Sequence, residues 1–299
     1  MFQSISRGFG FLGQAISMAR KDGDLIKPSL YGLVVGSIVG VVGAVPLIAA
    51  IILGGDSDVG RFIQYGLGAV LIFAQFAVAY IFSGMTAYLI YGYLAEGDGR
   101  MDKAWAIVRR DFLDILSLAV VSTLVKLLEN SLRGRNRRGR PNPFGAMLAN
   151  MLNTVWTTAT YFILPAMVIE DLSVWDGAKR ATELIKKNLL TVAVTEIGVG
   201  FVLGLANFVL GLLAVVLGVG IFLAFSAAGD QTALIIGGVL GAGVAGVLLA
   251  LISAVHSYVM TAYHTCMYLW ARDAEKAVAA GQSAQSVPAP APVAAVLAR

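Results

Sequence analysis

The sequence predicts an all-α integral membrane protein with six transmembrane helices. We expect these helices to form three hairpins, each preceded by an interfacial amphipathic helix. Apolar residues make up 58% of the 299-residue chain and charged residues only 13%, whereas a typical soluble domain carries about 25% charged residues. Apolar runs with almost no charge occur at 29–54, 62–95, 189–227 and 232–262. About 20 such residues in a helix span a bilayer.

A repeated pattern divides the chain into three units. The segment that begins at Met85 (Met-Thr-Ala-Tyr) recurs at Met260, and each copy is followed at the same spacing by Tyr-Leu and then Asp. Basic pairs recur before Asp or Asn, at Arg20-Lys21, Arg109-Arg110 and Lys186-Lys187. We therefore predict one membrane domain over 1–275, with pseudo-repeats at about 4–98, 99–171 and 172–275. The Pro/Ala-rich segment 276–299 lacks periodicity, which predicts a disordered cytoplasmic tail.

The elements follow from this pattern in order. Amphipathic segments, typical of helices that lie in the membrane interface, are expected at about 4–21, 100–110 and 173–187. The third opens with Ser173 and Asp176, spaced as in a capping box. Spans are expected at 29–53, 61–83, 111–128, 146–169, 193–226 and 232–256.

The span at 111–128 is the weakest, because Asp114 and Lys126 lie inside it. The distribution of Lys and Arg favours cytoplasmic N- and C-termini in a prokaryotic cell (inner) membrane. The arginine cluster from Arg133 to Arg140 opposes this rule, since it falls on the other side. The alternative is that 111–128 does not fully span and this loop stays cytoplasmic. Both topologies remain open at this stage.

Small residues recur at helical spacing within the spans. Glycine lets helix backbones approach closely in lipid, so such ridges mark helix-packing seams. The seams join helices either within one subunit or between subunits of a homo-oligomer. They comprise Gly32, Gly36, Gly40, Gly204, Gly211, Gly218, Gly237 and Gly241.

Ionisable residues at membrane depth are expensive and often functional. Glu196 and His256 are therefore candidates for a polar intramembrane site. A proton relay or a metal site would also need His264, but the spacing of these residues matches no ligand motif. We expect no metal and no cofactor.

The basic residues that flank the spans are candidates for contacts with anionic lipid headgroups or with a membrane-protein partner. We expect no nucleic-acid partner. The candidates are Arg20, Lys21, Arg109, Arg110, Lys186, Lys187, Arg133, Arg135, Arg137, Arg138 and Arg140.

Sequence motifs of soluble enzymes are absent from the chain. It contains no phosphate-binding Walker loop, no G-x-S-x-G, no HExxH and no cysteine cluster, since Cys266 is its single cysteine. We therefore expect a non-enzymatic protein without catalytic residues.

The residues from Trp156 to Pro165, the segment from Val168 to Asp171 and the basic residues up to Lys187 resemble a family of bacterial and archaeal six-span membrane proteins of unknown function. The segment from Asp22 to Pro28 carries the same resemblance. The chain is more distantly similar to the membrane domain of some glycerophosphodiester phosphodiesterases. That domain is not catalytic, so the resemblance implies no active site.

Two functions fit these observations. The glycine ridges favour a self-associating scaffold or assembly factor. The alternative is a channel or transporter with a site near Glu196 between repeats, as repeated transporters have. A polar stripe along several spans would favour the alternative, and its candidate members are Gln75, Asn150, Asn153, Thr154 and Asn207.

Overall fold

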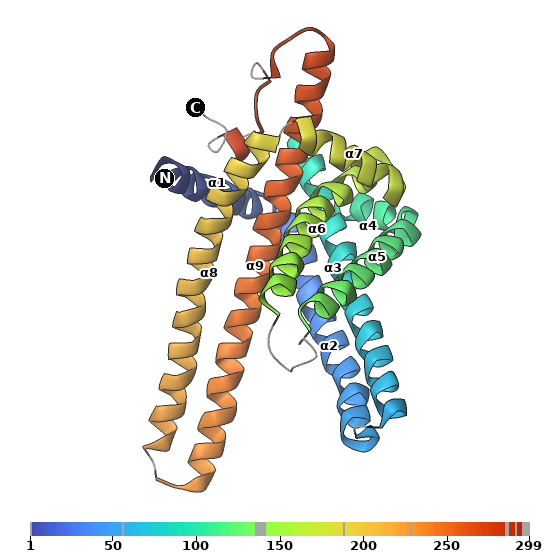
Figure 1. Cartoon of the computed structure of the whole chain (residues 1–299). Helices are drawn as coiled ribbons and strands as arrows, with labels where there is room; N and C mark the ends of the chain where they lie inside the picture. Colours follow the sequence, from blue (N-terminus) through green and yellow to red (C-terminus); the bar gives the residue numbers. More distant parts are fainter. Residues whose placement is uncertain are drawn as a thin grey trace.

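The computed structural model describes residues 2–55, 57–134, 142–187, 189–227, 229–284, 287–290 and 292–294. Side chains are described in these ranges except at 2–5 and 189–197. Within this part the chain is helical and contains no strand (Figure 1). The elements are α1 (Phe2–Lys21), the short 3₁₀ turn η1 (Gly23–Leu25), α2 (Lys27–Gly54), α3 (Asp58–Glu96), α4 (Met101–Arg110), α5 (Phe112–Leu132), α6 (Pro143–Glu170), α7 (Val174–Lys187), α8 (Leu189–Ser226) and α9 (Gln231–Ala279).

Five helical segments in the described part are long and apolar enough to cross a membrane. They are Gly23–Gly54, Asp58–Glu96, Pro143–Glu170, Gly198–Ser226 and Gln231–Ala279. The chain is therefore a membrane protein with several apolar helices. Helix α5, the weakest of the six expected spans, is not among the five, and it carries Asp114, Lys126 and Glu129. A sixth span at this helix stays a prediction.

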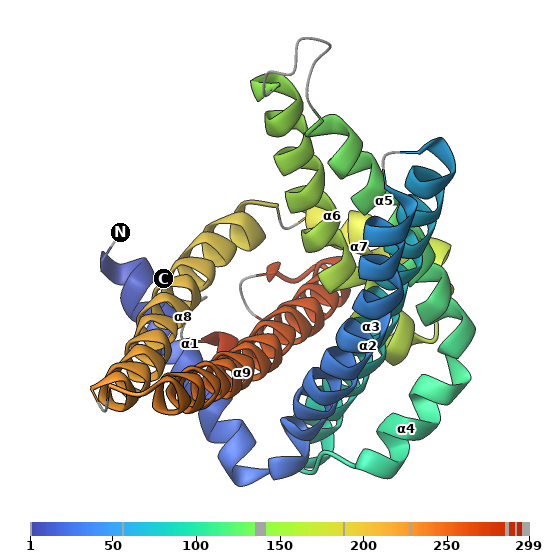
Figure 2. The same cartoon turned by 90° about the horizontal axis from the view of Figure 1, so that it is seen from below.

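The long helices lie side by side in pairs that follow one another along the chain. Both views show α2 beside α3, α5 beside α6 and α8 beside α9 (Figures 1 and 2). The shorter amphipathic helices α1, α4 and α7 lie toward the end of the molecule drawn at the top of Figure 1. The α5–α6 pair extends less far toward the opposite end than the other two pairs do. Among the helices that the structure describes, only the α2–α3 and α8–α9 pairs continue below this end of α5 and α6 (Figure 1).

The largest buried core lies where the amphipathic helices meet α3, α6 and α9. Met85 and Tyr263, from the two copies of the repeated segment, are both buried there. Phe11 of α1 packs edge-on against Tyr263, with ring centroids 5.4 Å apart. The Tyr258 hydroxyl donates a hydrogen bond to the Ala15 carbonyl oxygen, 2.9 Å away. The repeated segments therefore contribute to packing the amphipathic helix α1 against α9 and to the buried core.

Side-chain caps fix where several helices begin. Ser57, Asn142 and Asp230 accept hydrogen bonds from the first turns of α3, α6 and α9. Such caps satisfy backbone N–H groups that have no partner within the helix. Ser173 accepts from the Asp176 N–H and donates to the Asp176 carboxylate. This confirms the cap expected from the sequence at the start of α7.

The C-terminal end of α9 overlaps the segment that the sequence predicts to be a disordered tail. The helix continues to Ala279, so the predicted boundary at residue 275 lies within it. Further on, the side chain of Val293 is fully buried and belongs to the large core. Residues 285, 286, 291 and 295–299 lie outside the described part. Disorder of the tail stays a prediction.

Candidate binding pocket where the helix pairs meet

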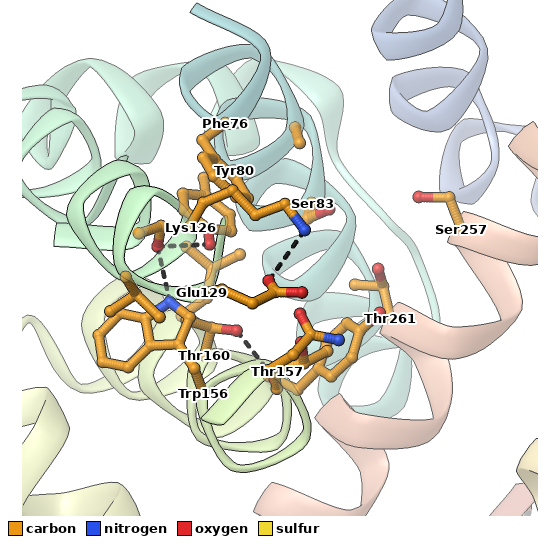
Figure 3. Close-up of a pocket in the computed structure, with 16 residues that line it drawn as sticks. Phe76, Tyr80, Ser83, Lys126, Glu129, Trp156, Thr157, Thr160, Ser257 and Thr261 are labelled. Carbon is orange, nitrogen blue, oxygen red and sulfur yellow. Dashed lines mark hydrogen bonds and ion pairs between the residues drawn. The ribbon is translucent and has the colours of Figure 1, made fainter. Parts of the chain in front are cut away.

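A pocket of about 360 Å³ lies between α3, α5, α6 and α9, so residues of all three helix pairs form its walls. Many of its lining side chains are polar, although these helices are mostly apolar. Figure 3 shows Lys126 and Glu129 pointing into the space that Tyr80, Thr157 and Thr261 also border. The polar lining residues are Tyr80, Ser83, Ser122, Lys126, Glu129, Asn153, Thr157, Thr160, Tyr161, Ser257 and Thr261.

Helical periodicity explains how the sequence assembles this lining. Residues three or four apart lie on one face of a helix. On α9, Ser257 and Thr261 are four apart, and on α6, Asn153 and Thr157 are four apart. Lys126 and Glu129 on α5 are three apart. Each of these three helices therefore presents a short polar stripe to the same cavity.

Ser122 fixes the aromatic wall of the pocket. It is fully buried on α5, and its Oγ lies 2.7 Å from the Tyr80 hydroxyl. The Trp156 Nε1–H donates to the same Oγ over 3.0 Å. These contacts join α3, α5 and α6 through one hydroxyl. Because buried tyrosine and tryptophan need a partner for their polar atom, Ser122 holds both rings in place.

Glu129 is the most deeply buried charged group of the pocket, with 1% of its surface exposed. Lys126 Nζ lies 2.9 Å from its Oε2, and Arg133 Nη2 lies 2.7 Å from its Oε1. Arg133 also donates to the Asn150 side-chain oxygen of α6, 2.6 Å away. A buried carboxylate is tolerated only when it is paired and hydrogen-bonded. The chain Lys126–Glu129–Arg133–Asn150 meets this requirement and ties α5 to α6.

The two ionisable residues singled out from the sequence lie elsewhere. Glu196 belongs to α8, and its side chain is outside the described part. His256 does not line the pocket. Its Nδ1 lies 2.6 Å from the Asn207 side-chain amide nitrogen, in a contact that joins α8 to α9. Asn153, another polar residue noted in the sequence, does line the pocket. Gln75 instead donates to the Gly36 carbonyl oxygen on α2.

The glycines of α2 lie against α3 of the same chain. A Cβ on Gly32 would lie 3.1 Å from Phe82, and one on Gly40 would lie 3.1 Å from the Gln75 amide nitrogen. A Cβ on Gly36 would meet the same glutamine at 3.6 Å. This ridge therefore serves packing between α2 and α3.

The glycines of α9 lie against α8 in the same way. A Cβ on Gly237 would clash with Phe225, and Gly218 and Gly241 face each other. A Cβ on Gly211 would contact Leu249 at an ordinary 3.6 Å. Among the described residues, a Cβ on Gly204 would find nothing within 4 Å.

The basic pairs lie at the ends of the amphipathic helices, and their side chains are exposed. Arg110 pairs with Asp111 at 2.6 Å and with Asp171 at 3.1 Å. The hydrogen bond from Arg110 to the Asp111 carboxylate raises the pKa of Arg110 above its ordinary value. Lys187 pairs with Glu275 of α9. Arg133 belongs to the pocket chain described above, while Arg135, Arg137, Arg138 and Arg140 lie outside the described part.

No cluster of three or more His, Cys, Asp or Glu side chains that could hold a metal ion occurs among the described residues. The groups available in the pocket are hydroxyls, an amide, aromatic rings and the Lys126–Glu129 pair. Such groups bind ligands by hydrogen bonding, charge pairing and stacking.

A protein-family model covers residues 63–278, which include nearly all of α3 and every helix from α4 to α8, and most of α9. The chain belongs to DUF6159, a family of unknown function. All the pocket-lining residues fall within the part that the DUF6159 model matches. No curated protein matches the sequence. The expected membership of an uncharacterised family is thus confirmed, while similarity to the membrane domain of glycerophosphodiester phosphodiesterases stays a prediction.

In the sequence, Lys126 is a charge that weakens the third expected span, and Glu129 is not among the candidate site residues. The signal that could have found them is their spacing, because an acid three residues after a lysine on one helix face predicts a pair. Tyr80, Ser122 and Trp156 carry no such signal. Their contacts span 34 and 42 residues, which only the fold brings together.

Proposed function

We propose that this DUF6159 protein is a non-enzymatic membrane transporter that binds a small polar or amphipathic molecule in the pocket between α3, α5, α6 and α9. The observation that carries the proposal is a cavity that many polar side chains line, although the helices around it are mostly apolar, with Glu129 buried in its wall. Charged side chains at membrane depth are rare, and they commonly mark pathways for substrates or ions.

The position of the pocket supports transport over scaffolding. Transporters built from internal repeats bind substrates where the repeats meet, and residues of all three helix pairs line this cavity. The glycine ridges that favoured self-association all contact a neighbouring helix of the same chain, except at Gly204. Packing within one subunit accounts for these contacts. The site proposed from the structure is centred on Glu129 instead of Glu196.

We propose cytoplasmic N- and C-termini in a prokaryotic inner membrane, with α1, α4 and α7 on the cytoplasmic surface. The support is the exposure of the basic pairs that end these helices, since the positive-inside rule places such residues in the cytoplasm. The same pairs would face anionic headgroups. Self-association and a membrane-protein partner remain secondary proposals, which the particle mass in nanodiscs would test.

Aqueous access to the pocket tests the proposed function. Ser257→Cys places a thiol at an exposed position of the pocket wall on α9. The matched control is Leu251→Cys, also exposed on α9 but apolar and outside the pocket lining. The native Cys266 is buried, so we expect little background labelling.

A water-soluble thiol reagent added to proteoliposomes should label the Ser257→Cys protein at least about tenfold faster than the Leu251→Cys protein, because thiolates form and react in water. Equal, slow labelling of both proteins would show that the pocket is closed to water and would contradict the transport proposal. The two proteins should elute alike on size exclusion, which checks that both are folded.

A further inference from the structure

Resting on the proposed function, we infer that the pocket takes a ligand with an anionic group, a phosphate or a carboxylate, and that Lys126 is its counter-charge. Three observations on α5 and on Arg133, which follows it, support this assignment. The first is that Lys126 has N–H donors without a partner among the described residues. The second is that both carboxylate oxygens of Glu129 already accept hydrogen bonds. The third is the net positive charge of Lys126, Glu129 and Arg133 together.

Lys126 has N–H donors that no described residue accepts from. Its ammonium group carries three N–H donors, and the structure gives it an ion pair with Glu129 alone among the described residues. Its side chain is 39% exposed and lines the pocket. Two N–H donors are therefore free for a ligand in the cavity. A phosphate or carboxylate oxygen is the natural acceptor for them.

Glu129 is not available to a cationic ligand in the same way. One of its oxygens accepts from Lys126 and the other from Arg133, so both are engaged. Its side chain is almost completely buried beneath these partners. A cation would have to displace one of the two bound charges to reach it. Glu129 therefore acts as a positioning residue that holds the Lys126 ammonium at the pocket wall.

The net charge of Lys126, Glu129 and Arg133 also favours an anionic ligand. Lys126 and Arg133 carry two positive charges against the single negative charge of Glu129, so the group has an excess of one positive charge. Arg133 is anchored to Asn150 of α6, and it binds the Glu129 oxygen that Lys126 does not. The excess positive charge attracts an anion, and the partial exposure of Lys126 and Arg133 weakens this attraction without removing it. An anion bound at Lys126 would neutralise the group.

The rest of the lining suits a molecule with a polar head and an apolar body. Hydroxyls of Ser83 and Ser257 line the same cavity as the apolar side chains of Phe76 and Leu164. Two sources provide such an anion: the headgroup of an anionic lipid, and a free solute that carries a phosphate or a carboxylate. Both present the same group to Lys126.

The charge preference of the pocket tests this inference without knowledge of the ligand. In the Ser257→Cys protein, labelling rates are measured with an anionic and a cationic methanethiosulfonate of similar size. Their ratio cancels changes in thiol reactivity that affect both reagents. We expect the ratio of anionic to cationic rates to be about tenfold higher for this protein than for a free thiol in solution, because one excess positive charge lies nearby.

Variants test whether Lys126 causes the preference for the anionic reagent. Lys126→Gln in the Ser257→Cys background should reduce the ratio to that of the free thiol, while Lys126→Arg should keep it. Lys179→Gln is the control, since Lys179 is an exposed lysine of α7 outside the pocket lining. If Lys126→Gln does not fold, the ratio measured in the Ser257→Cys protein alone still tests the inference.

The outcomes separate the two proposals. Fast labelling by both reagents with no charge preference, or a preference that survives Lys126→Gln, would overturn the anion assignment and leave the transport proposal intact. If neither reagent reacts, the anion assignment and the transport proposal are both overturned. If the preference is present, slower labelling in vesicles with phosphatidylglycerol than in phosphatidylcholine identifies a lipid headgroup. Slower labelling with added inorganic phosphate identifies a free anion, and either result supports the assignment.

Discussion

Gly218 of α8 and Gly241 of α9 lie backbone against backbone. A Cβ on Gly218 would lie 2.6 Å from the Gly241 carbonyl oxygen, and a Cβ on Gly241 would lie even closer to the Gly218 carbonyl oxygen. Real Cβ atoms do not occupy such positions, so no side chain fits on either residue without separating the helices. In lipid, close packing of this kind is a main source of helix association. The contact is one of those that hold the apolar helices α8 and α9 together.

Gly241→Ala should therefore destabilise the α8–α9 pair. The added methyl group must push the two backbones apart, and overpacking of this kind typically costs about 1–3 kcal/mol. Thermal unfolding of the protein in nanodiscs measures the effect as a lower Tm. The control is Gly238→Ala on the same helix, where an added Cβ would meet nothing within 4 Å among the described residues.

Gly238→Ala should leave Tm unchanged or raise it slightly, because alanine favours helix more than glycine does. A similar loss of Tm in both variants would indicate that helix propensity or lipid contact dominates at these positions. Close contact between Gly218 and Gly241 would then not be the source of stability.

Glu129→Gln should destabilise the α5–α6 pair. The substitution keeps the shape of the side chain but removes the negative charge, so the Lys126 and Arg133 cations lose their shared partner. Hydrogen bonds to charged groups are typically worth about 1.5–3 kcal/mol, and the partial exposure of both cations reduces the loss toward the lower value. Thermal unfolding again provides the measurement.

The comparison for this variant is Glu183→Gln, an exposed carboxylate of α7, whose removal should change stability little. Lys126→Gln combined with Glu129→Gln should be less harmful than the sum of the two single changes, because the double variant removes both members of the pair. Additive losses would mean that the two residues act independently and that the ion pair contributes no coupling.

Arg180 of α7 should couple this helix to the C-terminal parts of α6 and α9. Its guanidinium pairs with Glu170 at 3.2 Å and with Glu275, which also binds Lys187. Arg180→Gln leaves both carboxylates partly buried without this partner, so we expect a loss of about 1–3 kcal/mol and faster proteolysis at the ends of α7. Lys179→Gln, at the exposed neighbouring position, should change neither.

The contribution of Arg180 should not depend on pH between about 6 and 9. Burial tends to lower the pKa of its guanidinium, but the hydrogen bond to Glu275 and the charge of Glu170 outweigh burial and raise the pKa above its ordinary value. A raised pKa gives a contribution that is complete below the unfolded-state value and is lost only as the pH rises through the folded-state value. The wild-type and Arg180→Gln curves of Tm against pH should therefore stay parallel in this range. Curves that converge in this range would contradict the expectation.

Sequence patterns predicted the elements well but not the site. Hydropathy places the long apolar helices, since a bilayer requires about 20 apolar residues per span, and Ser173 correctly predicts the start of α7. The glycines of α2 and α9 predict close packing, but a ridge does not show which helix covers it. The pocket depends on contacts such as Trp156 with Ser122, which follow from the tertiary arrangement. Glu129 is hard to predict as a site residue from the sequence, because a charge within a weakly apolar segment also argues against a transmembrane span there.

His256 and Asn207 should stabilise the α8–α9 contact together. The Asn207 side-chain amide nitrogen lies 2.6 Å from His256 Nδ1, so the two side chains pair between α8 and α9. Hydrogen bonds between membrane helices average about 0.6 kcal/mol, with the largest near about 1.7 kcal/mol. The double-mutant cycle of His256→Leu and Asn207→Leu, measured by unfolding in nanodiscs, should give a coupling within this range.

Thiol labelling of the pocket in the Ser257→Cys background should not change when His256→Leu is added, because His256 holds α8 to α9 and does not line the pocket. A coupling near zero together with altered labelling would instead make His256 part of the site, as the sequence first suggested.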